Sequence, residues 1–255
     1  EPNWYLTASS AKRDFENSNI IYRNVTVRVK GLPVAYLPFL RMPDPSVDRA
    51  QGFLVPEAAL TSNLATGLKL PYFVPIGLSR DILLTPYFST KTNTFEYRYR
   101  QKFTNGDLAL NGSISNDELI KNKWRYFSRA VGSFKLLYDI DVNFDLGKVG
   151  DDSYLGDYVY SEESDLNSEI SLGKTVVKKR QFFDGNLSYL KEKEQGSALD
   201  EYFSLSGSYS REISSVNIPG KLRLSANLNS SLNVNDDNSF SRPPSSAQVG
   251  AHYDQ

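Results

Sequence analysis

Apolar and polar residues alternate along most of this chain, and helical periodicity is nearly absent. Residues that alternate in this way lie on opposite faces of a β-strand. From Thr94 to Phe103, for example, aromatic residues occupy one face and charged residues the other. About a dozen such strands, separated by turn signals, are expected between Gly52 and Tyr253. The pattern therefore predicts an all-β chain.

The longest alternating run extends from Trp124 to Leu146. It is longer than two membrane-crossing strands of about 10 residues each. We therefore expect a tight hairpin turn inside it, near Leu137 to Asp141.

The length of the alternating runs favours a transmembrane β-barrel. Apolar faces persist for about 10 to 14 residues, whereas strands in soluble proteins usually span about 3 to 10. Tyrosine and phenylalanine are frequent near the ends of these runs, as in the aromatic girdles at the two membrane interfaces. A soluble β-sandwich uses the same alternation, so periodicity alone leaves that alternative open.

Composition narrows the possible functions. The chain has 29 basic and 30 acidic residues, which gives no reason to expect nucleic-acid binding. It has no cysteine and a single histidine, His252, so it cannot form disulfides, thiolate metal sites or a histidine cluster. No nucleophile-elbow motif or phosphate-binding glycine loop is present. We therefore expect no enzyme activity, no cofactor and no metal site.

Mean hydropathy is −0.43, a value that usually indicates a soluble protein. Transmembrane barrels are an exception, because half of each strand faces a polar lumen. The longest apolar runs are far shorter than the ~20 residues of a membrane-spanning helix.

The chain divides into three parts by sequence. Residues 1–41 contain short alternating runs, which predict the C-terminal edge of a small β-sheet domain. Residues 42–51 include Pro43 and Pro45 and predict a stiff linker. Residues 52–255 carry the long series of strands. No leader sequence opens the chain, so we expect a piece of a longer precursor or a processed form.

Prolines interrupt the first strands of this series. Pro56, Pro71 and Pro86 are each expected in the middle of a short strand. Proline donates no hydrogen bond to a neighbouring strand. The three strands are therefore expected to pair weakly, or to form an edge that is kept weak.

Two segments flank the linker: GLPVAYLPF at residues 31–39 and RAQGFLVP at residues 49–56. They resemble the LPS-assembly outer-membrane proteins of the LptD (OstA/Imp) family, at the point where a periplasmic β-jellyroll leads into a barrel. Gln51 stands where the family has a serine. Residues 68–91 continue this specific similarity, and weaker similarity at residues 152–158 and 218–222 extends the resemblance over most of the chain.

The resemblance implies a fold and a function. The fold is the end of a periplasmic β-jellyroll followed by the first ~12 antiparallel strands of a large transmembrane β-barrel. The function is insertion of lipopolysaccharide into the outer leaflet through a lateral gate in the barrel. The implied partners are lipopolysaccharide, a plug lipoprotein of the LptE type, a periplasmic bridge protein of the LptA type and the barrel-assembly machinery. The implied location is the bacterial outer membrane, with the N-terminal segment in the periplasm.

The resemblance also assigns roles to individual residues. Pro56 and Pro71 match the prolines that weaken the lateral gate. The hinge between jellyroll and barrel is expected at Pro33, Tyr36, Pro38, Pro43 and Pro45. Some family members couple the two domains by disulfides, which this chain cannot form. About a dozen strands cannot close a barrel of the family's size, so the other side of the gate is expected outside this chain.

Four charged residues share one face of the run from Thr94 to Phe103: Glu96, Arg98, Arg100 and Lys102. They are candidates for a lumen lining that contacts sugar or phosphate groups. The alternative for each of them is an ordinary solvated strand face.

Two other functions stay open at this point. A general outer-membrane channel or porin would conduct ions through a stable pore. A soluble β-sandwich with a binding or structural role would remain in aqueous solution without detergent.

Overall fold

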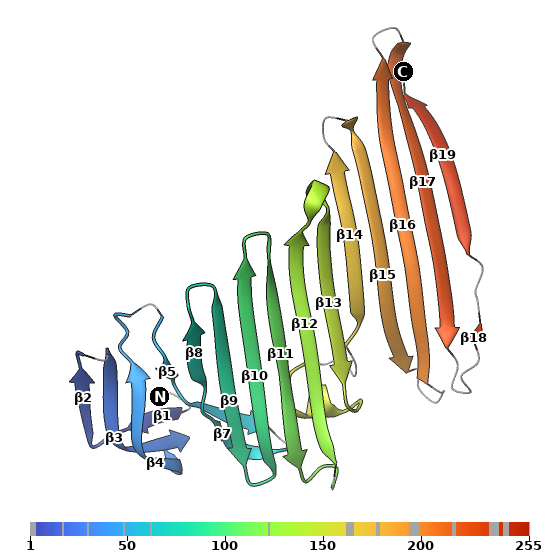
Figure 1. Ribbon diagram of the computed structural model, residues 1–255. Helices are drawn as coiled ribbons and strands as arrows, with labels where there is room; N and C mark the ends of the chain where they lie inside the picture. The colour runs from blue at the N-terminus through green and yellow to red at the C-terminus, as the bar shows by residue number, and fades with distance from the viewer. Residues whose placement is uncertain are drawn as a thin grey trace. The chain divides into compact units, whose positions relative to one another are not determined.

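The computed structural model consists almost entirely of β-strands (Figure 1). It describes residues 4–16, 18–29, 31–47, 49–61, 63–121, 123–161, 166–176, 179–193, 199–215, 218–234, 240–241 and 245–254. One short α-helix, α1 (Tyr154–Asp157), lies among these residues. The prediction of an all-β chain is confirmed.

The first four strands form a small antiparallel sheet: β1 (Trp4–Thr7), β2 (Ser10–Asp14), β3 (Asn19–Val29) and β4 (Leu32–Pro43). β4 pairs with one edge of β3, and β1 and β2 share the other edge. Asn24 lies between the part of β3 that pairs with β2 and the part that pairs with β1, and its φ of 50° is one that asparagine tolerates. Val25, Val27 and Leu40 are the buried apolar residues of this sheet.

The other strands form one large antiparallel sheet. They are β5 (Gly52–Phe53), β6 (Glu57–Thr61), β7 (Ala65–Lys69), β8 (Tyr72–Ile76), β9 (Arg80–Ser89), β10 (Thr92–Phe103), β11 (Gly106–Asp117), β12 (Trp124–Lys135), β13 (Asp141–Val149), β14 (Ser168–Val176), β15 (Gln181–Lys193), β16 (Leu199–Ser215), β17 (Ile218–Val234), β18 (Phe240–Ser241) and β19 (Ser246–Asp254). From β9 to β17 each strand pairs with the next strand along the chain. Most of the connections in this meander are short, as tight turns between antiparallel neighbours allow, but residues 150–167 with α1 join β13 to β14.

The turn predicted inside the longest alternating run is confirmed. A short 3-10 turn, Leu137–Asp139, separates β12 from β13. Leu136 N–H donates to the carbonyl of Ile140 at 2.7 Å and closes the hairpin. Tyr138 adopts a positive φ of 64°, which lets the chain reverse within these few residues.

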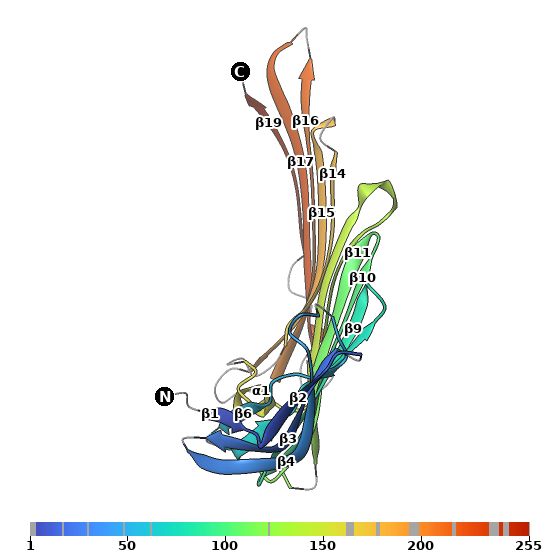
Figure 2. The same ribbon diagram turned by 90° about the vertical axis from the view of Figure 1, so that its left-hand side faces the viewer.

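Contacts between residues within the chain divide the molecule into two compact units. The first comprises residues 1–102, 109–128 and 149–164, and the second comprises residues 103–108, 129–148 and 165–255. The first unit has a core that includes Leu64, Tyr87, Tyr154 and Tyr158. α1 and β6 lie on the same side of strands β9–β11 in Figure 2, and the core residues come from α1 and the residue after it, from the turn after β6 and from β9.

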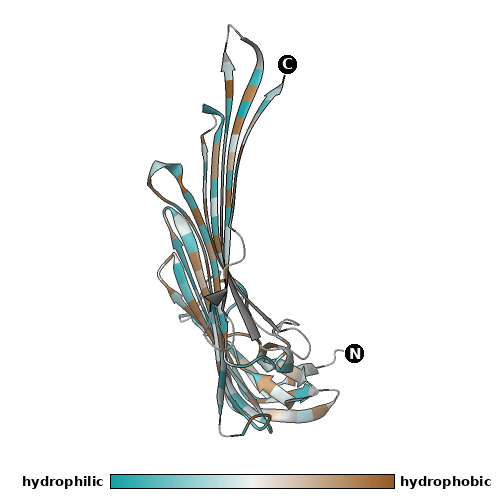
Figure 3. Ribbon diagram, turned by 90° about the vertical axis from the view of Figure 1, so that its right-hand side faces the viewer, coloured by the Kyte–Doolittle hydropathy of each residue, from teal (hydrophilic) through white to brown (hydrophobic). Residues whose placement is uncertain are grey.

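The second unit has a two-faced sheet. Along β15–β17, apolar and polar residues alternate (Figure 3). Leu187, Leu205 and Leu228 share one face and are each 47–48% exposed. Serine and asparagine occupy the other face, where Ser188 and Ser204 hydrogen-bond at 2.6 Å. This sheet therefore presents an apolar face that no described residue covers.

No helix in the part of the chain that the structure describes is both long enough and apolar enough to cross a membrane.

Candidate functional site

Two interrupted strands form the N-terminal edge of the large sheet. Residues 54–56 separate β5 from β6, and residues 70–71 separate β7 from β8. Pro56 and Pro71 lie in these breaks, so the expectation that they lie within strands is wrong, whereas Pro86 does lie within β9. The physical reason is that the strand ladder stops where a proline offers no N–H group.

The two breaks lie side by side. Leu54 N–H donates to the carbonyl of Pro71 at 2.8 Å, which joins one break to the other. On one side of the breaks Phe53 pairs with Tyr72, and β5 contributes only two paired residues in all. β5 is therefore held by few backbone hydrogen bonds, whereas the residues beside Pro71 are also joined to β9, where Leu70 N–H donates to the carbonyl of Pro86 at 3.0 Å.

The interrupted strand β5–β6 has one residue more between its two paired segments than the interrupted strand β7–β8. Residues 54–56 on the first strand face residues 70–71 on the second, between the pair Phe53–Tyr72 and the pair Glu57–Lys69. An extra residue in one strand is a β-bulge, which bends the strand and leaves one residue unpaired. The edge is thus bent as well as interrupted.

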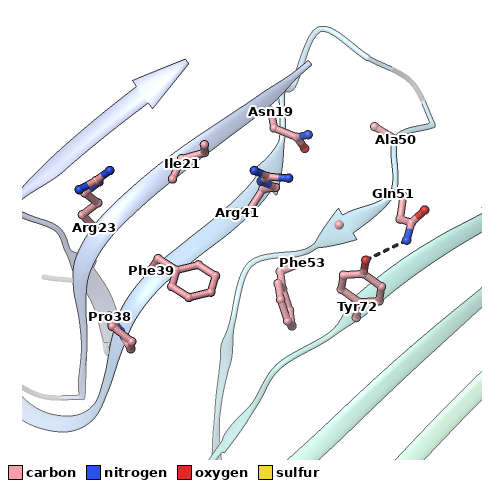
Figure 4. Close-up of a pocket in the computed structure, with 11 residues that line it drawn as sticks. Asn19, Ile21, Arg23, Pro38, Phe39, Arg41, Ala50, Gln51, Phe53 and Tyr72 are labelled. Atoms are coloured by element: carbon pink, nitrogen blue, oxygen red, sulfur yellow. Dashed lines mark hydrogen bonds between the residues drawn. The ribbon is translucent and has the colours of Figure 1, made fainter. Parts of the chain in front are cut away.

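A groove lies between the small sheet and these interrupted strands, and we call it the hinge groove (Figure 4). Its volume is about 900 Å³. Its lining residues are Asn19, Ile21, Arg23, Pro38, Phe39, Arg41, Ala50, Gln51, Gly52, Phe53 and Tyr72. Gln51 Nε2 donates to the Tyr72 hydroxyl at 2.9 Å and connects the linker to β8.

The hinge groove combines positive charge with aromatic surface. Arg23 and Arg41 both line it, and neither has an ion-pair partner among the described residues. The rings of Phe39 and Phe53 lie between the small sheet and β5 (Figure 4). The groove is therefore suited to an amphiphile that carries a negative charge, because guanidinium groups bind phosphate and carboxylate in a bidentate manner.

An apolar pocket of about 450 Å³ occupies the other face of the small sheet. Tyr22, Leu40 and Met42 line it, together with Val55 from the first break. Residues that alternate along β3 and β4 reach opposite faces, so Ile21 and Arg41 line the hinge groove while their neighbours line this pocket.

The residues predicted as a hinge lie in or next to β4. Pro33, Tyr36 and Pro38 are within the strand, Pro43 is its last residue, and Pro45 lies in the following turn. Of these five, Pro38 alone lines the hinge groove.

The turn after β4 is held by Asp44, a buried carboxylate. Asp44 pairs with Arg13 of β2 and accepts a hydrogen bond from the Ser46 N–H at 2.9 Å. The backbone hydrogen bond from Ser46, helped by the Ser46 hydroxyl and Arg13, lowers the pKa of Asp44 below its usual value of 3.8. The start of the linker is therefore fixed to the small sheet.

The predicted lumen residues lie on one face of β10, and two of them have protein partners. Glu96 accepts hydrogen bonds from Lys69 at 2.7 Å and from the Tyr160 hydroxyl at 2.5 Å. Arg100 forms a two-bond pair with Asp81 at 2.9 and 3.1 Å. Arg98 is half-buried and Lys102 is exposed.

The α1 segment, residues 151–160, covers a buried polar cluster that the sequence did not reveal. Tyr154 shares hydrogen bonds with Ser113 at 2.8 Å and with Ser115 at 2.5 Å. Burial raises the pKa of Tyr154 to about 12, so its hydroxyl stays neutral. The family-like element at residues 152–158 was the available signal, but it indicated no structural role.

Arg125 of β12 fixes the α1 segment to the sheet. Its side chain is fully buried and contacts Asp117 at 3.1 Å, Asp151 at 2.8 Å and Asp157 at 2.8 Å. Burial would raise the pKa of Asp151, but hydrogen bonds and charge from Arg125 outweigh it and hold this pKa below its usual value. We interpret this arrangement as structural, because Arg125 donates its hydrogen bonds to side chains of the protein itself.

Comparison with known proteins finds sequence similarity to LPS-assembly proteins named LptD. The LPS-assembly protein LptD of Pseudoalteromonas atlantica is 25% identical over 179 residues, which is 68% of this chain and 24% of that protein. LptD of Bordetella pertussis is 27% identical over 161 residues, which is 62% of this chain and 20% of that protein. LptD of Polaromonas sp. is 26% identical over 199 residues, which is 75% of this chain and 24% of that protein.

These matches confirm the resemblance to the LptD family. The chain spans about a fifth to a quarter of the length of these relatives. No family model matches the chain.

Proposed function

We propose that this chain is the gate-side part of a lipopolysaccharide-assembly protein of the bacterial outer membrane. The observation that carries the proposal is the hinge groove, which joins two guanidinium groups, neither ion-paired among the described residues, to aromatic rings beside an interrupted sheet edge. Lipopolysaccharide has the matching chemistry, since its lipid anchor carries phosphate groups next to acyl chains. Arg23 and Arg41 would bind the phosphates, while Phe39 and Phe53 would contact the acyl chains.

The small sheet would deliver the lipid to this groove as the end of a periplasmic jellyroll. The apolar pocket lined by Leu40 and Met42 supports this role, because it offers acyl chains an environment without charged side chains. In this proposal residues 1–41 form the jellyroll edge, residues 42–51 the linker and residues 52–255 the N-terminal part of the barrel.

The interrupted edge would form one side of the lateral gate, with Pro56 and Pro71 as its weakening residues. A backbone hydrogen bond contributes a net of about 0.5–1.5 kcal/mol. β5 has two paired residues and one further bond from Leu54, so separating it from a neighbour costs less than separating a continuous strand.

A membrane location is supported by the uncovered apolar face of β15–β17. Soluble monomers rarely expose contiguous apolar patches larger than a few hundred Å². Leucine side chains repeat along this face at roughly half exposure, as expected where lipid is the solvent. This face argues against the soluble sandwich, which would need a second layer to cover it.

Other elements of the proposal depend on the resemblance alone. They are the plug lipoprotein of the LptE type, the bridge protein of the LptA type and the barrel-assembly machinery as partners. A lumen role for β10 is best supported at Arg98 and Lys102, because Glu96 and Arg100 are already engaged by Lys69 and Asp81.

Site-specific photo-crosslinking in the complete protein, expressed in cells, tests the route. A photoreactive residue at Phe39 faces the hinge groove, and a matched control at Phe15 lies in the exposed turn after β2. We expect a lipopolysaccharide adduct at Phe39 and none at Phe15. An inserted, folded protein that gives no adduct at Phe39 would refute the route and favour the porin, which predicts ion conductance without lipid contact.

A further inference from the structure

The α1 segment contacts the β6–β7 hairpin as well as the strand that carries Arg125. Its tyrosines also pack against the turn of the β6–β7 hairpin, where Leu64 is completely buried with Tyr154 and Tyr158. Asn63 Nδ2 of the same turn donates to Asp157 at 3.0 Å. The hairpin at the sheet edge is thus joined to a segment about ninety residues further along the chain.

Strand β9 completes the attachment of the hairpin turn. Ser89 Oγ donates to the carbonyl of Leu64 at 2.5 Å, and the buried ring of Tyr87 packs in the same cluster. Tyr158 connects the cluster to β10 by a hydroxyl contact with Thr92 at 2.7 Å, and to β11 by donating to Asp117 at 2.9 Å. The hairpin turn, three strands and α1 therefore form one packed group.

The other end of β7 is attached to the same segment. Lys69, its last residue, pairs with Glu96 at 2.7 Å. Tyr160 donates to the same carboxylate at 2.5 Å, and the Lys69 ammonium lies 5.6 Å from the centre of the Tyr160 ring. β7 is therefore fixed at both ends by residues of the α1 segment or by their partners.

The part of the edge beyond the proline breaks has no such attachment. Among the described residues, β5 and β8 make no hydrogen bond or ring contact with the α1 segment. β5 is held by its two pairs with β8, by Leu54 and by Arg49, which donates to the carbonyl of Leu78 at 2.5 Å. β8 is nevertheless paired with β9 from Tyr72 to Ile76, so β5 is the weakly attached strand of this edge.

We propose that the α1 segment is an internal clamp that fixes the β6–β7 hairpin, so that movement of the sheet edge is confined to β5 and the break at residues 54–56. Arg125, Leu64, Asn63 and Tyr158 are its positioning residues. The proposal rests on the proposed function only in treating this edge as a gate. The attachment itself is a property of the fold and can be measured without lipopolysaccharide.

Amide hydrogen exchange of the complete protein in lipid nanodiscs tests the clamp. In the wild type, the amides that hydrogen-bond β6 to β7 should exchange at least about tenfold more slowly than the Leu54 amide, a difference of about 1.4 kcal/mol. Leu64→Ala removes the buried side chain and should accelerate exchange in β6 and β7 by about tenfold or more. Leu64→Met nearly keeps the volume and should retain slow exchange.

Leu78→Ala is the matched control, because Leu78 is 95% exposed in the turn between β8 and β9. It should leave exchange in β6 and β7 unchanged. If Leu64→Ala fails to insert, Asn63→Ala tests the same attachment by removing only the hydrogen bond to Asp157, and should accelerate exchange severalfold in the paired β6 and β7 amides. Unchanged β6 and β7 exchange in an inserted variant, or an equal response to Leu78→Ala, would overturn the clamp.

The exchange experiment and the crosslinking experiment fail independently. Protected β6 and β7 amides without an adduct at Phe39 would keep the clamp and refute the lipid route. An adduct at Phe39 with β6 and β7 amides that exchange as fast as that of Leu54 would keep the route and refute the clamp.

Discussion

Replacing Arg125 by methionine should release the α1 segment. The substitution keeps an unbranched side chain but removes the only cation that Asp117 and Asp157 contact among the described residues. Asp117 has a fully buried side chain, so its carboxylate would be left without a countercharge. Removing one partner of a buried ion pair costs about 3–5 kcal/mol. The free energy that holds the segment closed should fall by that amount.

Limited proteolysis of the folded protein in detergent, followed by mass spectrometry, measures this loss. At about 3 kcal/mol, local opening of residues 151–160 becomes more than about 100-fold more frequent, and cleavage should rise in proportion. Arg129→Met is the matched control: it lies on the same strand and face, but its pair with Asp145 is 46% exposed on the arginine side. An exposed pair contributes about 0–1 kcal/mol, so cleavage should hardly change.

Equal protease resistance of the wild type and Arg125→Met would refute the reasoning. The serine and tyrosine hydrogen bonds would then be sufficient to hold the segment. Arg125→Lys separates charge from geometry, because a lysine restores one positive charge but cannot reproduce the forked bonds to Asp151. An intermediate rate of cleavage is expected for it.

Three further changes probe the edge, the groove and the linker. Pro71→Val restores an N–H opposite Leu54 and should add about 0.5–1.5 kcal/mol to the edge, which slows the appearance of newly made lipopolysaccharide at the cell surface. Arg23→Glu combined with Arg41→Glu reverses the charge of the hinge groove and should abolish the adduct at its aromatic residues, whereas neutral glutamine substitutions should only weaken it. The pKa of Asp44 is lowered in the folded state, so its contribution to stability is complete above pH 3.8 and is lost as the pH falls through the lower folded value. In an acid titration, the Ser46 amide, which donates a hydrogen bond to the Asp44 carboxylate, should therefore lose its protection from exchange in that pH range.

Much of the strand pattern could be predicted because alternation is a local signal. The turn at Leu137–Asp139 followed from the length of one run. The expected place of Pro56 and Pro71 within strands was wrong, since a missing N–H ends a short strand rather than weakening its middle.

The site itself depends on contacts between distant parts of the sequence. Asn63 and Asp157 meet although 94 residues separate them, and residues 151–160 look like an ordinary polar loop when read alone. Arg23 and Arg41 show the same limit, because spacing places them on one face of two paired strands but does not show that the linker passes over that face. Arg125 is similar, since an arginine in an alternating strand usually indicates a solvated face.

The break between β7 and β8 does not change the alignment of either piece on β9. Gly67 pairs with Ser89 on one side and Ile76 pairs with Arg80 on the other, in a single unshifted register. A slip of one residue would turn every side chain to the opposite face. Both pieces of the interrupted strand therefore present their side chains to the same faces as an unbroken strand would, because β9 aligns them in one register.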